Sequence, residues 1–249
     1  MNKKTMNMKK GIVLIFVIIV TILFFSSCYE MQLRCIKGNG NLTEEYRVHE
    51  DFSKVVSTGS FDVFITYDTL YEVHIEAEEN LMQYIETEVR GTKLYIEERD
   101  NRCLRTNYPI IIRIKTPEIT AVNLTGSGNI MCDSVNTEMF EIDLIGSGDI
   151  TANIWADFIE ADLTGSGEIN LIGEADETDF SIPGSGNIRT LDLMQNECYA
   201  EILGSGNIYV NVLEYLEVKI TGSGNVYYLG NPVIDYQILG SGDIIAIND

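Results

Sequence analysis

Apolar and polar residues alternate around a Gly-Ser-Gly triplet that recurs seven times in the second half of the chain. The triplets begin at Gly126, Gly146, Gly165, Gly184, Gly204, Gly222 and Gly240, so their period is 18 to 20 residues. A period near 20 that carries strand signals is typical of a solenoid, in which each repeat packs only against its neighbours.

Apolar columns separated by two residues flank the triplet on both sides. The column two residues before the triplet holds Leu124, Leu144, Leu163, Ile182, Ile202, Ile220 and Ile238. The column four residues before it holds Val122, Ile142, Ala161, Phe180, Ala200, Val218 and Tyr236. The column four residues after its first glycine holds Ile130, Ile150, Ile169, Ile188, Ile208, Val226 and Ile244. Polar residues stand between these columns, so each copy predicts a strand, a turn and a strand with one face inward. Stacked copies predict an all-β fold, a parallel β-helix-like solenoid.

The triplets themselves are interpreted as structural corners. Glycine adopts positive φ without steric cost and lets successive backbones approach closely. The corner glycines are Gly126, Gly128, Gly146, Gly148, Gly165, Gly167, Gly184, Gly186, Gly204, Gly206, Gly222, Gly224, Gly240 and Gly242. A polar residue follows each triplet, and stacked Asn side chains there are expected to hydrogen-bond along the axis.

Two ligand-binding explanations of the glycines fit less well. A phosphate-binding loop needs a Lys and a Ser or Thr after it, and none follows. A calcium-binding β-helix repeat needs aspartates at a period of nine. The sequence therefore predicts no metal and no cofactor, and leaves open only an occasional divalent ion near Asp149 and Glu168.

Residues 50–118 are strand-rich but lack the regular period, and we expect them to cap the first coil of the unit at 119–249. Strands are predicted at 55–67, 71–77, 93–98 and 109–117, and a short helix at 79–89. The segment 55–67 contains a degenerate copy of the repeat, with Gly59-Ser60-Phe61 in place of the triplet.

The N-terminus has the pattern of an export signal. Four lysines precede an apolar run from Ile12 to Phe25 that is too short for a bilayer span, and Cys28 follows two serines. This end resembles a bacterial lipoprotein signal, which predicts a signal peptide at 1–27, lipid attachment at Cys28 and a linker at 28–49. Plain secretion and an uncleaved anchor are the alternatives. We expect an outer-membrane or cell-surface location.

The net charge limits which molecules the chain can bind, and the cysteines limit which disulfide it can form. Without residues 1–27 the chain carries 13 Lys and Arg against 38 Asp and Glu, a formal charge of −25. Such a surface argues against nucleic acid. In an exported protein Cys35 and Cys103 are free to pair, whereas Cys132 and Cys198 stand at expected core positions.

The stretches "FSKVVSTGSFDVFIT", "EAEENLMQYIETEV" and "PIIIRIKTPEITAVNLTGSGNI" resemble the putative auto-transporter adhesin, head GIN domain family. The resemblance covers about residues 50–247. It implies a right-handed β-helix in exported lipoproteins, with no established molecular activity. The chain ends just after the last coil, so we expect no translocator barrel.

Candidate site residues form two groups. Acids stand five residues before the triplet at Glu141, Glu160, Asp179, Glu217 and Asp235, but almost no bases accompany them, so no catalytic residue is predicted. Tyr209 and Tyr227 occupy equivalent outward positions, and Tyr199 lies nearby in the sequence. They are either a binding platform or an ordinary aromatic ladder.

The sequence therefore favours a non-catalytic, adhesin-like envelope lipoprotein that binds a glycan or a protein through a β-helix face. Two other functions stay open: a polysaccharide-acting enzyme, and a structural protein that self-assembles into oligomers.

Overall fold

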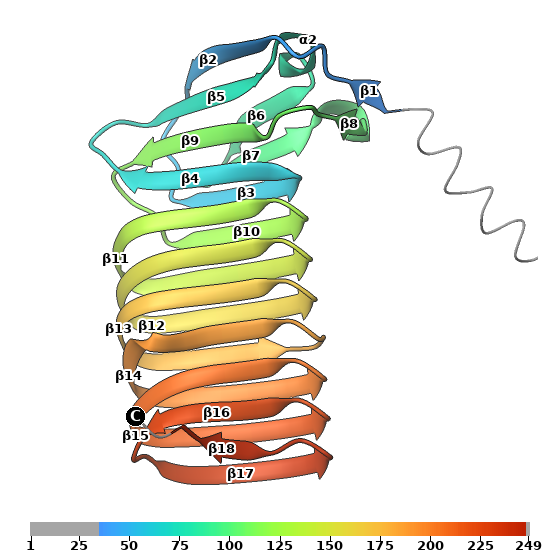
Figure 1. The fold of residues 1–249 in the computed structure, drawn as a ribbon. Helices are drawn as coiled ribbons and strands as arrows, with labels where there is room; N and C mark the ends of the chain where they lie inside the picture. The colour runs from blue at the N-terminus through green and yellow to red at the C-terminus, as the bar shows by residue number, and fades with distance from the viewer. Residues whose placement is uncertain (1–34, 248–249) are drawn as a thin grey trace, which may run out of the picture.

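The apolar columns of the repeat become continuous buried ladders. Leu124 pairs in register with Leu144, and Ile150 pairs with Ile169, and all four side chains are buried. The computed structural model, which describes residues 35–247, is a parallel β-solenoid of about seven turns, as the period predicts (Figure 1).

From residue 121 onward the elements follow one another along the rod in chain order, with long bent strands in the middle and short strands at the C-terminal end. In the N-terminal region the strands at 54–67 lie next to the repeat, and the other strands stack beyond them (Figure 1). The elements are β1 (Ile36–Lys37), β2 (Leu42–Val48), β3 (Lys54–Gly59), β4 (Phe61–Tyr67), β5 (Glu72–Glu78), α2 (Glu79–Met82), β6 (Ile85–Arg90), β7 (Lys93–Glu98), η1 (Arg99–Asn101), β8 (Leu104–Arg105), β9 (Ile110–Thr116), β10 (Ala121–Gly126), β11 (Asn129–Gly146), β12 (Asp149–Gly165), β13 (Glu168–Ile182), β14 (Asn187–Gly204), β15 (Asn207–Gly222), β16 (Asn225–Gly230), β17 (Val233–Gly240) and β18 (Ile244–Ala246).

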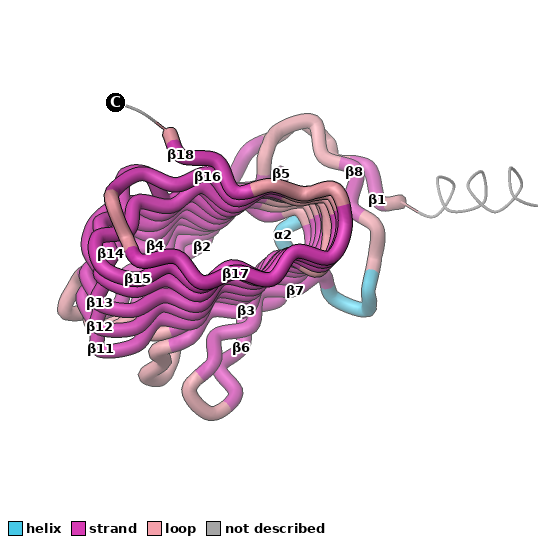
Figure 2. The backbone as a smooth tube through the Cα atoms, turned by 90° about the horizontal axis from the view of Figure 1, so that it is seen from below, coloured by secondary structure: helices cyan, strands magenta, loops and turns pink. Residues whose placement is uncertain are grey.

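The rod has a flattened outline with two long sides when it is viewed along its axis (Figure 2). The side before each triplet contains β10, β17 and the later halves of β11 to β15, and it continues through β3, β7 and β6. The side after each triplet contains the earlier halves of β11 to β15 with β16 and β18, and it continues through β4, β9, β5 and β2. The triplets form one edge of the outline, and the bends of β11 to β15 form the other, rounded edge.

The triplets turn the corner, as predicted. The first glycine has φ between +132° and +154° in every triplet except the one at Gly184, which follows Pro183. The backbone N–H of the serine donates to the carbonyl oxygen of the first glycine one coil earlier, as Ser147 does to Gly126 at 2.9 Å. Stacked amides follow the corner: Asn207 donates to Asn187 at 3.1 Å.

The degenerate copy forms a genuine coil. Gly59 pairs in register with Gly126 and has φ +133°. Strands β3 and β4 therefore lie on the two long sides like their counterparts in the repeat. The strands predicted at 71–77, 93–98 and 109–117 appear as β5, β7 and β9.

Two expectations about the N-terminal region are wrong. The helix predicted at 79–89 is confined to Glu79–Met82, because the chain then enters β6 as an antiparallel partner of β7. The segment 28–49 is not linker throughout: from residue 35 onward it carries β1 and β2, and β2 pairs with β5 over its whole length.

The pairing of Cys35 with Cys103, which the sequence left open, is present as a disulfide. Cys132 and Cys198 are buried in the core, as expected. Cys28, the predicted lipid-attachment residue, and the predicted signal peptide lie outside the described residues. Within residues 35–247, no helix has the length and apolar character needed to cross a bilayer.

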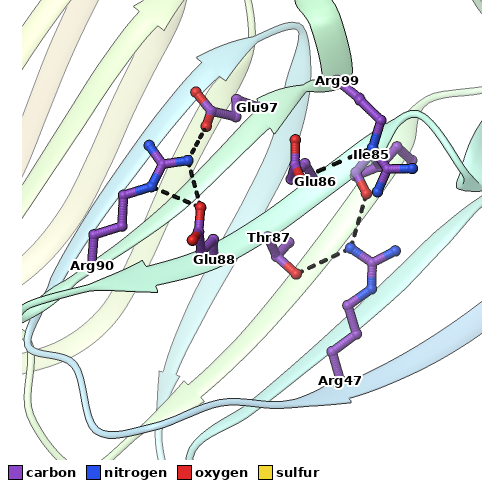
Figure 3. A network of polar contacts seen from close by, with 8 residues as sticks. All are labelled: Arg47, Ile85, Glu86, Thr87, Glu88, Arg90, Glu97 and Arg99. Atoms are coloured by element: carbon purple, nitrogen blue, oxygen red, sulfur yellow. Dashed lines mark hydrogen bonds and ion pairs between the residues drawn. The ribbon is translucent and has the colours of Figure 1, made fainter.

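The N-terminal end of the rod is closed by cross-links between its two long sides. Arg47 of β2 donates to the Ile85 carbonyl oxygen at 2.9 Å and to Thr87 Oγ1 at 3.0 Å, both in β6 (Figure 3). Helix α2 lies within the outline of the coils in Figure 2 and buries Leu81 and Met82. The Arg47 hydrogen bonds thus join β2 and β6, which are the outermost strands of the two long sides at this end of the rod.

Candidate functional site

The side before the triplets carries the predicted acidic column, and we call it the acidic face. Glu141, Glu160, Asp179, Tyr199, Glu217 and Asp235 follow one another in register along the rod. A second column two residues later adds Asp143, Asp162 and Glu201. The strand pairing therefore confirms the alignment read from the sequence.

Burial and repulsion between stacked carboxylates shape the chemistry of this face. Partial burial, followed by the charge of Asp162, raises the pKa of Glu160. The same two causes raise the pKa of Asp143 and of Asp179. The bases on this face lie near its ends, where Lys54 pairs with Glu141 at 2.7 Å and Lys219 pairs with Glu201. The middle of the face thus holds carboxylates without a basic partner among the described residues.

This arrangement does not form a metal centre. Among residues 35–247 no three His, Cys, Asp or Glu side chains converge on a point that could hold an ion. Asp149 and Glu168, where the sequence left a divalent ion open, lie on neighbouring coils, and Asp149 Oδ1 accepts from the Glu168 backbone N–H at 3.1 Å.

The side after the triplets carries the predicted tyrosine pair, and we call it the tyrosine face. The rings of Tyr209 and Tyr227 stack with centroids 4.7 Å apart and an interplanar angle of 7°. The Arg189 guanidinium lies 4.4 Å from the Tyr209 centroid and pairs with Glu168 at 2.7 Å. Both faces of the Tyr209 ring are therefore covered, which is how an aromatic ladder packs.

The structure does not bring the three predicted tyrosines together. Tyr199 lies in the acidic column, on the opposite long side from Tyr209 and Tyr227. Its ring packs edge-to-face against Tyr215, with centroids 6.4 Å apart. A binding role for these tyrosines stays a prediction, and any ligand would meet them on two separate surfaces.

A recess that the sequence did not point to lies on the rounded edge, and we call it the edge groove. Its floor contains Ala156 and Ala175, which pair in register and pack against the core. The recess has a volume of about 340 Å³, within the range of ligand sites. An adjoining recess that shares Asn136 and Thr137 extends it toward the N-terminal end.

The two walls of the edge groove differ in chemistry. One wall stacks Trp155, Glu174 and Met194 on successive coils. The opposite wall holds Asp157, Asp176 and Asn196, with the Asn196 amide donating to Asp176 at 3.1 Å. Leu213 lines the end of the recess, in the coil that follows Asn196.

Trp155 is the chain's single tryptophan, and 46% of it is exposed although it stands in a regular strand. Met194 and Leu213 are 43% and 46% exposed. Sequence reasoning missed these residues because they lie where the coil bends. At the bends the strand pairing shifts register between Asn170 and Gly173 and again between Thr190 and Met194. Residues at the same distance from a glycine are therefore no longer equivalent there.

The buried cysteines take no part in a site. Burial raises the pKa of Cys132 to about 12, and burial is also the main cause that raises the pKa of Cys198 to about 12. Thiols with such values are protonated at neutral pH and therefore unreactive.

A β-solenoid with two decorated faces and an open groove defines an extended repeat protein whose surface suits recognition of other molecules. The family model described as "Putative auto-transporter adhesin, head GIN domain" matches residues 51–232. The chain belongs to this family, as the sequence resemblance implied. The description is that of an adhesin-like protein, which suits export to the cell surface. A search of curated proteins finds no match.

Solved structures of three bacterial proteins share the fold. A putative adhesin from Bacteroides fragilis superposes with a TM-score of 0.81 at 22% identity, covering 85% of this chain and all of that one. A protein from Parabacteroides distasonis described as a putative lipid binding protein gives 0.72 at 28% identity, covering 86% and 99%. A putative adhesin from Parabacteroides merdae gives 0.70 at 21% identity, covering 86% and 100%.

Proposed function

We propose that this protein is a non-catalytic, adhesin-like lipoprotein of the bacterial envelope that binds a glycan or a protein through the surface of its β-solenoid. The observation that supports binding is the edge groove, which pairs the exposed ring of Trp155 with a polar wall. A recess of this volume is large enough to hold a small ligand.

The lack of bases among the central carboxylates supports a non-catalytic role. A glycosidase needs one carboxyl that acts as an acid beside one that stays ionised, in environments that push their pKa values apart. Here Glu160 and Asp179 are raised in pKa by the same causes, burial and neighbouring acids. Catalysis would appear as reducing-sugar release that Glu160→Gln abolishes.

Attachment through Cys28 belongs to the same proposal. Acylation of Cys28 would hold the N-terminal end of the rod close to the membrane, because few residues separate Cys28 from the disulfide at Cys35. The test is metabolic labelling with an alkynyl fatty acid. We expect label on the wild type and none on Cys28→Ala; label retained by the variant would refute the anchor.

The soluble domain, residues 29–249, tests ligand binding directly. It should bind a subset of an array of glycans and extracellular proteins, or adhere to cells, and give no sugar release. Light scattering on the same sample tests the self-assembly alternative. Rods that lengthen with concentration and bind nothing else would replace the proposed function.

The protein from Parabacteroides distasonis that is described as lipid binding gives one further ligand class to include. One wall of the edge groove contains Trp155 and Met194, but Glu174 stands between them and the opposite wall bears two more carboxylates. Fatty acid and phospholipid therefore enter the same binding panel as competitors rather than as the expected ligand.

A further inference from the structure

We infer that the edge groove is a glycan subsite that takes an uncharged saccharide lying along the rod, with a sugar ring against Trp155. This inference rests on the proposed function and deepens it by naming the site and the ligand class. Four properties of the groove support this inference: its direction along the rod, the wall that carries Trp155, the opposite polar wall, and its negative charge.

The groove crosses the strands instead of following them. Its floor and walls are columns of equivalent residues from β12, β13 and β14, so its long direction is the rod axis. The main-chain groups of these strands are already used in parallel pairing between coils. A peptide in the groove would find few backbone partners for its own N–H and C=O groups, which are costly to leave unpaired.

A saccharide does not need such backbone partners. Its ring presents an apolar C–H face that can pack on an indole, and Trp155 offers the largest exposed aromatic surface in the groove. Met194 lies two coils farther along the same wall, and Glu174 stands between them on the intervening coil. The wall thus offers one indole ring, a carboxylate acceptor beside it and a second apolar contact at Met194.

The opposite wall supplies hydrogen-bond acceptors for hydroxyl groups. Asp157 and Asp176 are carboxylates, each able to accept several hydrogen bonds, and Asn196 adds an amide that both donates and accepts. Asp176 already accepts one hydrogen bond from Asn196, which fixes the orientation of both side chains. A vicinal diol is the group that such a row of acceptors fits.

The charge of the groove excludes acidic sugars. Asp157, Glu174 and Asp176 line it, and no Lys or Arg does so among the described residues. A uronic or sialic acid would bring a carboxylate against three others and lose binding energy at low ionic strength. The same carboxylates disfavour an acyl chain, since burying them against hydrocarbon would cost their hydration.

The sole tryptophan makes the test direct, because all indole fluorescence of the soluble domain comes from the groove. Neutral oligosaccharides from the array are titrated while Trp155 emission is followed. Binding in the groove should shift or quench the emission, and calorimetry should give the same Kd. A glycan that binds by calorimetry without moving the emission would place the site elsewhere and overturn the inference, leaving the proposed function intact.

Variants separate the groove from the other faces. Trp155→Ala should weaken binding about tenfold or more, as loss of a buried aromatic contact does. Asp157→Asn keeps the shape of the wall and should weaken neutral-glycan binding about 2- to 10-fold, through weaker acceptors. The matched controls are Tyr227→Ala on the tyrosine face and Asp235→Asn on the acidic face, which should leave the Kd unchanged.

The remaining outcomes also discriminate. Preference for uronic-acid glycans, or binding only to a protein, would overturn the inference while supporting the proposed function. Binding only to a lipid would overturn both. Absence of any binding would overturn both. Circular dichroism and the urea midpoint of Trp155→Ala confirm that the variant is folded, and Trp155→Phe, which retains a ring, should recover part of the affinity.

Discussion

At the scale of single residues, close approach between coils requires both glycines of a triplet, and the first also needs positive φ. A Cβ on Gly146 would lie against the carbonyl oxygen of Gly126 and one on Gly148 against that of Gly128, but only Gly146 has positive φ. The degenerate copy supports this distinction. It keeps Gly59 but has Phe61 at the third position, where no earlier triplet lies beneath it, and the Phe61 side chain is fully buried.

This distinction predicts that Gly148→Ala destabilises the rod through overpacking. The added methyl group must separate two coils that are hydrogen-bonded to each other, so we expect a loss of about 1–3 kcal/mol in the free energy of unfolding by urea. Gly91→Ala is the control, because Gly91 has φ +68° but nothing within 4 Å of the added Cβ. A larger loss at Gly91 would mean that backbone conformation, rather than contact between coils, governs the repeat.

How far single residues could be predicted depended on whether the repeat kept its register. Inward positions such as Cys198 and Phe180 were identified because they stand at fixed offsets from a glycine, and both are buried. Trp155 stands beyond the point where coils differ in length, so no offset indicated that it would remain exposed. A single tryptophan in a strand of alternating residues can equally be a core residue or an exposed one, and only the path of the bend determines which it is.

At the scale of elements, the acidic face makes stability depend on pH. An acid whose pKa is raised in the folded state binds its proton more tightly there than in the unfolded chain, so folding is favoured below the unfolded value and weakened as pH rises through the folded value. Glu160, Asp143 and Asp179 all have raised pKa values. The burial of these carboxylates, together with their mutual repulsion, therefore opposes folding at neutral pH, and mild acid relieves both.

Glu160→Gln should consequently raise the urea midpoint at pH 7 and leave it little changed at pH 4. The gain should stay below about 1 kcal/mol, because the side chain is exposed to solvent and salt. Glu214→Gln, which changes an exposed acid at the rounded edge, is the control and should leave the urea midpoint unchanged at both pH 7 and pH 4. A stability loss for Glu160→Gln at pH 7 would indicate that the stacked carboxylates are bridged by cations.

Strong acid weakens the contacts of Glu78 at the N-terminal end, whereas mild acid relieves the acidic face. Its buried carboxylate accepts hydrogen bonds from the Asn107 side chain and backbone, and these lower its pKa. A lowered pKa stabilises the fold above the unfolded value, and the effect is lost as pH falls through the folded value. The rod and its cap are therefore expected to loosen under different conditions, with the cap opening first in strong acid.

Arg47 tests how the two sides are held together at this end (Figure 3). Arg47→Met keeps the apolar stem but removes the hydrogen bonds to Ile85 and Thr87, which should cost about 1–3 kcal/mol. Hydrogen exchange should rise in β2 and β6 while β12 to β14 stay protected. Arg90→Met is the control: Arg90 pairs with Glu88 and Glu97 within the β6–β7 hairpin, so its loss should stay below about 1 kcal/mol. Equal exchange changes in both variants would contradict a closing role for Arg47.

At the scale of the whole molecule, the repeat was predictable and its N-terminal cap was not. The same strand-turn-strand pattern occurs seven times, so an irregularity in one coil does not obscure the apolar columns. In the cap, strands such as β2 and β5 run antiparallel and β6 doubles back on β7, and each pairing depends on partners distant in sequence. The apolar pattern of 79–89 suited a helix, yet pairing with β7 determined its structure from Ile85 onward.

A solenoid whose coils contact only their neighbours should tolerate removal of a whole coil. Deleting residues 149–167 joins Gly148 to Glu168, which takes the place of its register partner Asp149. The leucine and isoleucine ladders then continue without a break, and the inward and outward alternation is kept. We expect a shorter rod that still unfolds cooperatively, with a lower midpoint and a smaller m-value because less surface is buried. Deleting residues 149–158 is the matched control: it places Glu160 at an inward position and Ile159 at an outward one, and it should abolish folding although fewer residues are lost. If the whole-coil deletion were no better folded than this control, stability would depend on contacts spread along the rod, and the coil would not be its structural unit.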